Sequence, residues 1–236
     1  MDVTRESPTR RERLRTATVA EIKGLARRML VAGGPQAISL RAIARDMGMT
    51  APAIYRYFPS LDALVFALAE DLYTELRETV DAARAGAADP GEQLAEMARA
   101  FRRWSLAHPA EFGLIFGNPV PGVASFEGEC LGPEHAAARF GAVFLEVFAE
   151  FWKHRPLPTP PEGDIEAKLG PYLEPYHEHH EVPLPVTAIY AYLSGWTRLY
   201  GLVALEVFGH LQWAVTDVEP LFELEIQSLL HGGAPS

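Results

Sequence analysis

The segment from Thr50 to Phe58 carries side chains suited to contacts with a nucleic acid. Read as a helix, it has an inward side made of Ala53, Ile54, Tyr57 and Phe58. Its outward side begins with small residues and continues with hydrogen-bonding ones, namely Ala51, Pro52, Tyr55 and Arg56. A helix that enters the major groove leads with its N-terminal end, where small side chains permit a close approach to base edges. The chemistry predicted for this segment is therefore contact with DNA.

A second group of residues has the types found in metal sites. His177, Glu178, His179, His180 and Glu181 supply imidazole and carboxylate groups, which are ordinary zinc ligands. They lie in an acidic stretch before Pro183, without i, i+4 spacing on an evident helix. We interpret this stretch as a solvated loop and predict no metal and no cofactor. Cys130, in a glycine-rich loop without nearby cations, is interpreted as an incidental thiol.

The DNA-contacting segment must be held by neighbouring elements, and the sequence around it predicts a helix-turn-helix. Leu40, Ile43, Ala44 and Met47 follow the helical template, and Ser39 stands before them as an N-cap. Gly48 falls where the turn needs a residue tolerant of positive φ. Thr50 is expected to cap the second helix, Pro52 lies in its first turn, and Ser60 is expected to cap the helix that follows.

The remainder of the chain also has helical periodicity. A first helix is predicted from Thr16 to Ala32, and a long one from Leu61 towards Gly86 carries Leu64, Leu68, Leu72 and Leu76 four residues apart. Further helices are predicted over residues 90–108, 134–154, 186–208 and 218–231, with short ones near 110–116 and 165–169. No strand-like alternation is present, so the predicted fold is all-α, with about nine helices.

Composition and charge separate the chain into two parts. It has 236 residues, 48% of them apolar, one cysteine and a net charge of −10. Residues 1–60 hold 11 Lys and Arg against 5 Asp and Glu, a balance of +6, which leaves −16 for the remainder. This asymmetry indicates a basic module that contacts phosphate and an acidic body that stays away from it. Without an apolar run long enough for a membrane or a secretory signal, the expected location is the cytoplasm.

We therefore predict three regions: a flexible basic arm at 1–15, a helix-turn-helix domain at 16–60, and a helical regulatory and dimerisation domain at 61–231. The arm has two readings. Its arginines are either part of a disordered start without a specific role, or they approach phosphates or a minor groove.

Residues 16–64 resemble the DNA-binding head of TetR-type transcriptional regulators. The resemblance rests on the runs at 37–44, 48–50 and 53–58, followed by Ser60, Leu61, Asp62 and Leu64. A weaker resemblance covers Trp196–Gly209, similar to the Trp…His-Gly class of TetR C-terminal domains, with Tyr200 where histidine is common. The resemblance implies a homodimer whose paired recognition helices bind a palindromic operator, and a small effector that releases the DNA.

Residue roles follow from this resemblance. It implies base contacts from Thr50, Ala51 and Ala53, phosphate contacts from Ser39, Arg41, Tyr55 and Tyr57, and either kind from Arg56. Leu61 departs from the family pattern, because a phosphate-binding lysine often stands there. Only the helix N-terminus then remains to bind that phosphate.

The effector site is predicted from aromatic residues at helical spacing. The residues expected to line an apolar cavity are Met97, Phe101, Trp104, Phe112, Phe116, Phe144, Phe148 and Trp196. Such stripes also form plain core, so that alternative stays open. Tyr192 and Arg198 are expected to point elsewhere and receive no ligand role.

The last two helices are the predicted dimer interface, since two from each subunit form a four-helix bundle. The helix from Leu61 to Gly86 is expected to transmit a pendulum-like motion from effector to DNA. Two other classes of protein compete with this reading. A metal-dependent enzyme would need facing Glu-x-x-His pairs, which the predicted core helices lack. A non-specific architectural DNA protein would have a basic body, whereas this one is strongly acidic. The sequence thus predicts a regulator and no enzyme.

Overall fold

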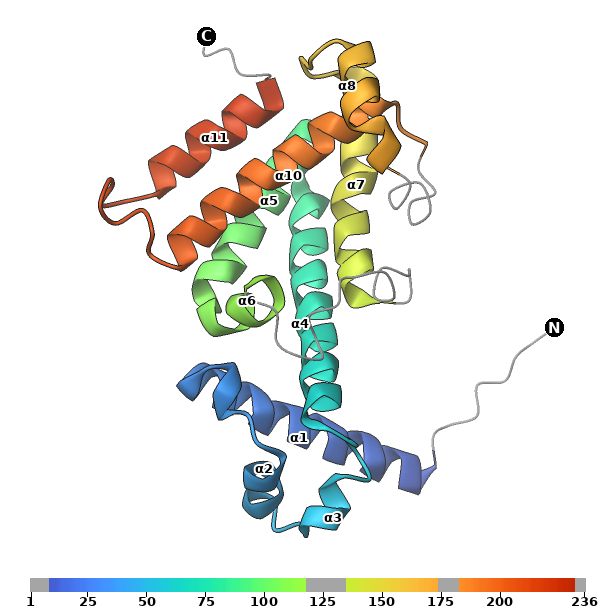
Figure 1. The fold of residues 1–236 in the computed structure, drawn as a ribbon, viewed down its shortest axis with the longest axis vertical. Helices are drawn as coiled ribbons and strands as arrows, with labels where there is room; N and C mark the ends of the chain where they lie inside the picture. Colours follow the sequence, from blue (N-terminus) through green and yellow to red (C-terminus); the bar gives the residue numbers. More distant parts are fainter. Residues whose placement is uncertain (1–8, 118–134, 174–182, 232–236) are drawn as a thin grey trace, which may run out of the picture. The chain divides into compact units, whose positions relative to one another are not determined.

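A computed structural model describes residues 9–117, 135–173 and 183–231 of the chain. Within these residues the fold is all-helical, with ten α-helices and no strand, which confirms the predicted class. In chain order the α-helices are α1 (Arg10–Gly33), α2 (Leu40–Asp46), α3 (Ala51–Ile54), α4 (Leu61–Ala83), α5 (Pro90–Ala107), α6 (Pro109–Phe116), α7 (Ala136–His154), α8 (Glu162–Lys168), α10 (Val186–Val207) and α11 (Glu219–His231) (Figure 1). Short 3-10 turns follow α1, α4 and α8, at Pro35–Ala37, Arg84–Gly86 and Gly170–Tyr172.

The chain divides into two compact units. The first holds the described residues up to Asp71 together with α6 from Ala110, and the second holds Leu72–Pro109 with the described residues from His135 onward. The division thus falls inside α4, whereas the sequence places the end of the helix-turn-helix domain at residue 60. The inclusion of α6 in the N-terminal unit has no counterpart in the sequence-based division.

The N-terminal unit is built around the helix-turn-helix. Its core contains the fully buried Ile22 and Leu30 of α1, Ile43 of α2 and Ile54 of α3. Ser39 caps α2, accepting a hydrogen bond from the Ala42 amide at 3.4 Å. Gly48 has φ +64°, a left-handed conformation that glycine adopts without strain, as the turn requires.

The start of α1 corrects one prediction. The helix begins at Arg10 and not at Thr16, so Arg10–Arg15 are helical and do not belong to a flexible arm. Thr9 and Glu12 form a capping box, in which the Thr9 hydroxyl accepts from the Glu12 amide and the Glu12 carboxylate accepts from the Thr9 amide at 2.7 Å. This reciprocal pair satisfies two backbone donors and sets the helix start earlier than the apolar stripe indicates.

Helix α4 runs through both units. Ser60 caps it, accepting from the Ala63 amide at 3.0 Å, as predicted. The expected ladder is confirmed, since Leu64, Leu68, Leu72 and Leu76 are each at most 2% exposed. Two of these leucines lie in each unit, so one continuous helix contributes to both cores.

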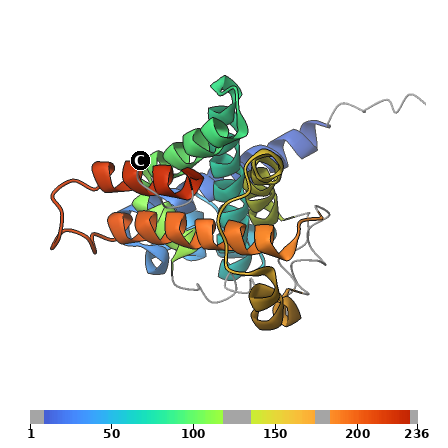
Figure 2. The same ribbon diagram turned by 90° about the horizontal axis from the view of Figure 1, so that it is seen from above.

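The second unit is a bundle of the later helices. Helices α5 and α7 pack together, and α10 contacts both of them as well as α11. Figures 1 and 2 show α10 and α11 running side by side. The aromatic stripe of α7 faces this core: Phe140, Phe144 and Phe151 are at most 5% exposed. Asp89 caps α5 and Asp217 accepts from the Glu219 amide at the start of α11.

Two sequence interpretations lie outside the described residues. These are the thiol of Cys130 and the His/Glu stretch at 177–181. Of the helices that are described, none is long and apolar enough to cross a membrane.

Candidate functional site

The surface of the helix-turn-helix has the two sides that the sequence predicts. Ile54 is fully buried and Phe58 is 7% exposed, whereas Ala51, Pro52, Tyr55 and Arg56 are exposed. Helix α3 itself covers only four residues and is continued by a turn, in which the Phe58 amide donates to the Ile54 carbonyl at 3.1 Å. The outward side is therefore available to a partner over its whole length.

The eight DNA-binding candidates lie on α2 and α3, at the N-caps of these two helices and in the turn after α3. None of them is buried: Ser39, Ala53 and Tyr57 are half-buried, and Arg41, Thr50, Ala51, Tyr55 and Arg56 are exposed. Thr50 holds the N-cap position of α3, but its side chain makes no capping hydrogen bond, so the prediction that it caps this helix is wrong. Its hydroxyl keeps its hydrogen-bonding capacity for another partner.

Leu61 opens α4 and is 39% exposed. An isobutyl side chain gives a phosphate no charge and no hydrogen bond. The backbone amides at the start of α4 are then the groups that can receive a phosphate at this point.

An apolar cavity of about 90 Å³ lies within the second unit, among α5, α7, α10 and α11. Its walls consist almost entirely of aliphatic and aromatic side chains. The lining residues include Leu94, Ala95 and Ala98 of α5, Phe144, Phe148 and Phe151 of α7, Tyr192, Gly195, Trp196 and Leu199 of α10, and Ile226 and Leu229 of α11. A lining of this kind selects for apolar groups.

Three of the eight predicted pocket residues line this cavity: Phe144, Phe148 and Trp196. Met97 and Phe101 are fully buried in the adjoining core, where the Phe101 ring lies 5.6 Å from that of Trp196. Trp104 is also buried, and its indole donates to Glu75 of α4 at 2.9 Å. Phe112 and Phe116 belong to α6 in the N-terminal unit, with ring centroids 5.1 Å apart.

Tyr192 lines the cavity, so the expectation that it points elsewhere is wrong. Tyr192, Gly195, Trp196 and Leu199 follow i, i+3, i+4, i+7 spacing and so share one face of α10. This spacing is a sequence signal from which these residues could have been predicted to line the cavity. The Tyr192 hydroxyl donates to the Gly141 carbonyl at 3.2 Å and leaves the ring against the cavity.

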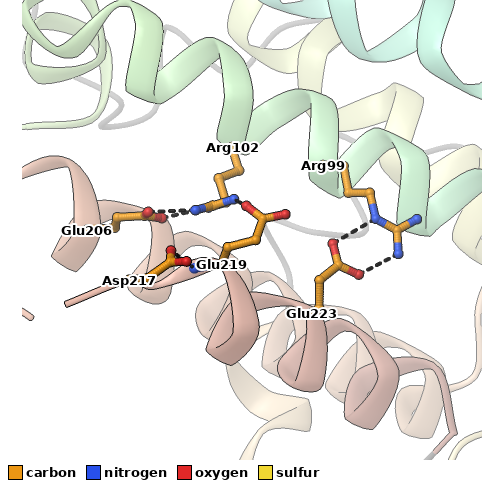
Figure 3. A network of polar contacts seen from close by, with 6 residues as sticks. All are labelled: Arg99, Arg102, Glu206, Asp217, Glu219 and Glu223. Atoms are coloured by element: carbon orange, nitrogen blue, oxygen red, sulfur yellow. Dashed lines mark hydrogen bonds and ion pairs between the residues drawn. The ribbon is translucent and has the colours of Figure 1, made fainter. Parts of the chain in front are cut away.

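Arginine–glutamate pairs fasten α5 to α10 and α11 (Figure 3). Arg102, 7% exposed, donates from Nε and Nη2 to the two Glu206 oxygens, each at 2.7 Å, and also bonds Glu219. Its guanidinium lies 5.0 Å from the Phe222 ring centroid. Beside it Arg99 donates to both oxygens of Glu223, at 2.8 and 2.6 Å. The Arg102–Glu206 pair fixes α10 against α5, and the Arg99–Glu223 pair fixes α11 against the same helix.

The hydrogen bonds from Arg99 lower the pKa of the Glu223 carboxyl, because they stabilise its charged form more than partial burial opposes it. Arg198, on the outer side of α10, pairs with Glu225 and Ser228 and takes no part in the cavity. Across the described residues no group of three or more His, Cys, Asp or Glu side chains could hold a metal ion.

Comparison with known proteins identifies the family that shares this architecture. Residues 24–68 match the family model of bacterial regulatory proteins of the tetR family, and residues 94–229 match the tetracyclin repressor-like C-terminal domain. The chain belongs to the TetR family. It is a DNA-binding transcriptional regulator with an N-terminal helix-turn-helix.

Sequences of known regulators are similar to this chain over nearly its whole length. The HTH-type transcriptional regulators Mb1846 of Mycobacterium bovis and Rv1816 of Mycobacterium tuberculosis are each 32% identical over 221 residues, which cover 89% of this chain and 90% of theirs.

Solved structures share the fold. The crystal structure of the protein SCO4313 is 34% identical, with a TM-score of 0.72 over 94% of this chain and 99% of that one. A TetR/AcrR-family regulator from Thermobifida fusca is 19% identical, with a TM-score of 0.56 over 93% of this chain and all of that one.

Proposed function

We propose that this TetR-family protein is a cytoplasmic, ligand-responsive repressor that binds a palindromic operator as a homodimer. A small apolar or aromatic effector releases it from DNA. The observation that carries this proposal is the outward side of the helix-turn-helix, where small residues at Ala51 and Pro52 are followed by the exposed Tyr55 and Arg56. In this reading Thr50, Ala51 and Ala53 contact bases, while Ser39, Arg41, Tyr55 and Tyr57 hold phosphates.

Exposed apolar residues on the last two helices support the dimer. Leu193 and Leu205 are 37% and 42% exposed along one side of α10, Phe208 at its C-cap is 44% exposed, and Leu224 of α11 is 64% exposed. Gly201 lies on the same side of α10, and a Cβ added there would project into open space. Exposed apolar side chains on either side of a small residue are suited to close packing against a second helix pair.

The cavity supports the proposal that the effector is apolar or aromatic. Its walls are apolar, but about 90 Å³ is small beside the roughly 300–1,000 Å³ of most ligand sites. A larger effector must therefore move the helices around the cavity, and such an effector binds the expanded state in preference to this one. That difference in affinity is what a release mechanism requires. Helix α4, shared by the two units, is the element through which the change reaches the DNA-binding surface.

Selection of bound sequences from a random DNA pool tests the operator half of this proposal. A symmetric dimer with two recognition helices selects an inverted repeat, with half-site centres about one helical turn apart. Recovery of no palindrome, or equal affinity for random DNA, would contradict both the dimer and the reading surface.

Screening of small apolar compounds for release of that palindrome tests the effector half. The variant Ala98→Leu fills the cavity from α5 without adding a polar group. We expect it to bind the operator as the unchanged protein does and to need a much higher effector concentration for release. If Ala98→Leu responds to the effector as the unchanged protein does, the effector binds outside this cavity.

A further inference from the structure

A second concave surface lies in the N-terminal unit, beside the end of the recognition segment. It has a volume of about 520 Å³ and is lined chiefly by Arg10, Arg11 and Arg15 of α1 together with Arg56 and Tyr57. Four arginines from two separate elements therefore border one open space. We call it the arginine concavity.

The concavity exists because α1 extends beyond the core of its unit. Leu14, Thr18, Ile22, Ala26 and Leu30 are four residues apart and form one row along the helix. The last three are fully buried, whereas Leu14 is 60% exposed. The row thus leaves the core at its N-terminal end, and the arginines that flank it there border the concavity. The Thr9–Glu12 capping box holds this overhanging turn in helical form.

Within the described part of the chain, no acidic side chain pairs with the charge of the concavity. Among the residues that the structure describes, none of the four arginines has a carboxylate partner, although acidic residues pair with arginines throughout the second unit. The nearest acid along the helix, Glu12, accepts from the Thr9 amide at 2.7 Å and from the Thr9 hydroxyl at 2.9 Å. The Arg15 guanidinium lies 5.3 Å from the centroid of the Tyr57 ring, so the ring positions it without cancelling its charge.

We propose that the arginine concavity binds the phosphate backbone of DNA, as a clamp separate from the base-reading end of α3. Guanidinium groups suit this role, since their planar donors match phosphate oxygens. The clamp contributes affinity and salt dependence but no sequence choice, because phosphates are the same in every sequence. This inference rests on the proposed DNA-binding function and adds a binding surface on α1 to it.

The test compares the double variant Arg11→Gln/Arg15→Gln with Arg13→Gln. All three substitutions keep a helix-forming residue, and Arg13 lies on the same helix without lining the concavity. Binding of the selected palindrome and of a scrambled duplex is measured by fluorescence anisotropy at several KCl concentrations. For each phosphate contact removed, the slope of log K against log [KCl] should become shallower by about 0.9.

We expect a shallower slope for the double variant only, with both duplexes weakened by the same factor. Three outcomes would overturn the clamp: an unchanged slope, a change no larger per charge than that of Arg13→Gln, or a selective loss of palindrome over scrambled DNA. Failure of the proposed function itself would be visible separately, because the unmodified protein would then show no preference for the palindrome.

Discussion

The guanidinium of Arg102 is almost excluded from water and carries a permanent charge, so its partners decide what a substitution costs. Glu206 meets it with both oxygens, Glu219 bonds it from α11, and the Phe222 ring covers it. Removal of the arginine leaves the carboxylate of Glu206, whose side chain is 12% exposed, without its partner.

We expect Arg102→Ala to lower the free energy of unfolding by about 3–5 kcal/mol, the usual cost of breaking a buried ion pair from one side. Urea denaturation at fixed protein concentration measures this. Arg198→Ala is the matched control, because it breaks an exposed pair with Glu225, for which less than about 1 kcal/mol is expected. Equal losses in the two variants would show that burial does not set the cost.

Glu223 gives the stability a dependence on pH. Its pKa is lowered by the hydrogen bonds from Arg99, so the pair stabilises the fold above the ordinary carboxyl pKa of about 4.3. This contribution is lost as the pH falls through the lowered pKa of the folded protein. Unfolding free energies of the unchanged protein and of Glu223→Gln should therefore differ most above pH ~5 and converge in more acidic solution. If the difference in unfolding free energy between the two proteins stays constant with pH, the ionisation of Glu223 does not cause the pH dependence of stability.

Individual residues also show where sequence reasoning stops. Burial of Ile54 and Phe58 followed from local periodicity, because the helix-turn-helix is a short motif whose faces are fixed by spacing alone. The cavity depends on four helices meeting, and neither Ala98 nor Gly195 shows from its own position that a gap will lie beside it. Phe101 was a plausible cavity residue because it belongs to an aromatic stripe at helical spacing. Such a stripe does not tell a cavity wall from filled core, and Phe101 lies in the filled core.

At the scale of elements, α10 offers a direct test of the dimer. Gly201→Arg places a long charged side chain on the exposed apolar side of α10, where it meets open space within the subunit. We expect a folded monomer, since burial of an unpaired charge in the interface costs several kcal/mol or more. Sedimentation or size-exclusion chromatography measures the change in mass.

Gly163→Arg provides the control for that experiment. Gly163 lies on α8 and is exposed, and a Cβ added to it would likewise project into open space. This variant should stay dimeric. If Gly201→Arg also stays dimeric, the interface does not include this side of α10.

Element boundaries were predictable where a local cap set them. Ser39 and Ser60 each cap the helix that the sequence assigns to them. The start of α1 was missed, because the arginine-rich run was interpreted as an arm while its Thr-x-x-Glu cap is an equally local signal. No local signal of this kind predicts that α6 belongs to the N-terminal unit, since the sequence of an eight-residue helix does not encode which unit it joins.

At the scale of the whole molecule, the proposed release mechanism predicts a change in the distance between the two DNA-binding units of a dimer. Replacing Cys130 by serine and introducing Arg45→Cys gives one exposed label on each protomer. Double electron–electron resonance should show one distance between the two spin labels with operator DNA and a different one with a releasing effector. An unchanged distance, together with effector-released DNA, would exclude the pendulum motion of α4.

The membership of α6 in the N-terminal unit has a practical meaning for building chimaeric regulators. Arg27 of α1 donates to Glu111 of α6 at 2.9 Å, and that carboxylate is only 3% exposed, as is expected of a contact made inside one folding unit. A DNA-binding module cut after residue 71 loses this acid and the fully buried Phe112 with it. The part of this protein that can be transplanted onto a foreign sensor is therefore discontinuous in sequence, and a graft must carry α6 as well as the first 71 residues.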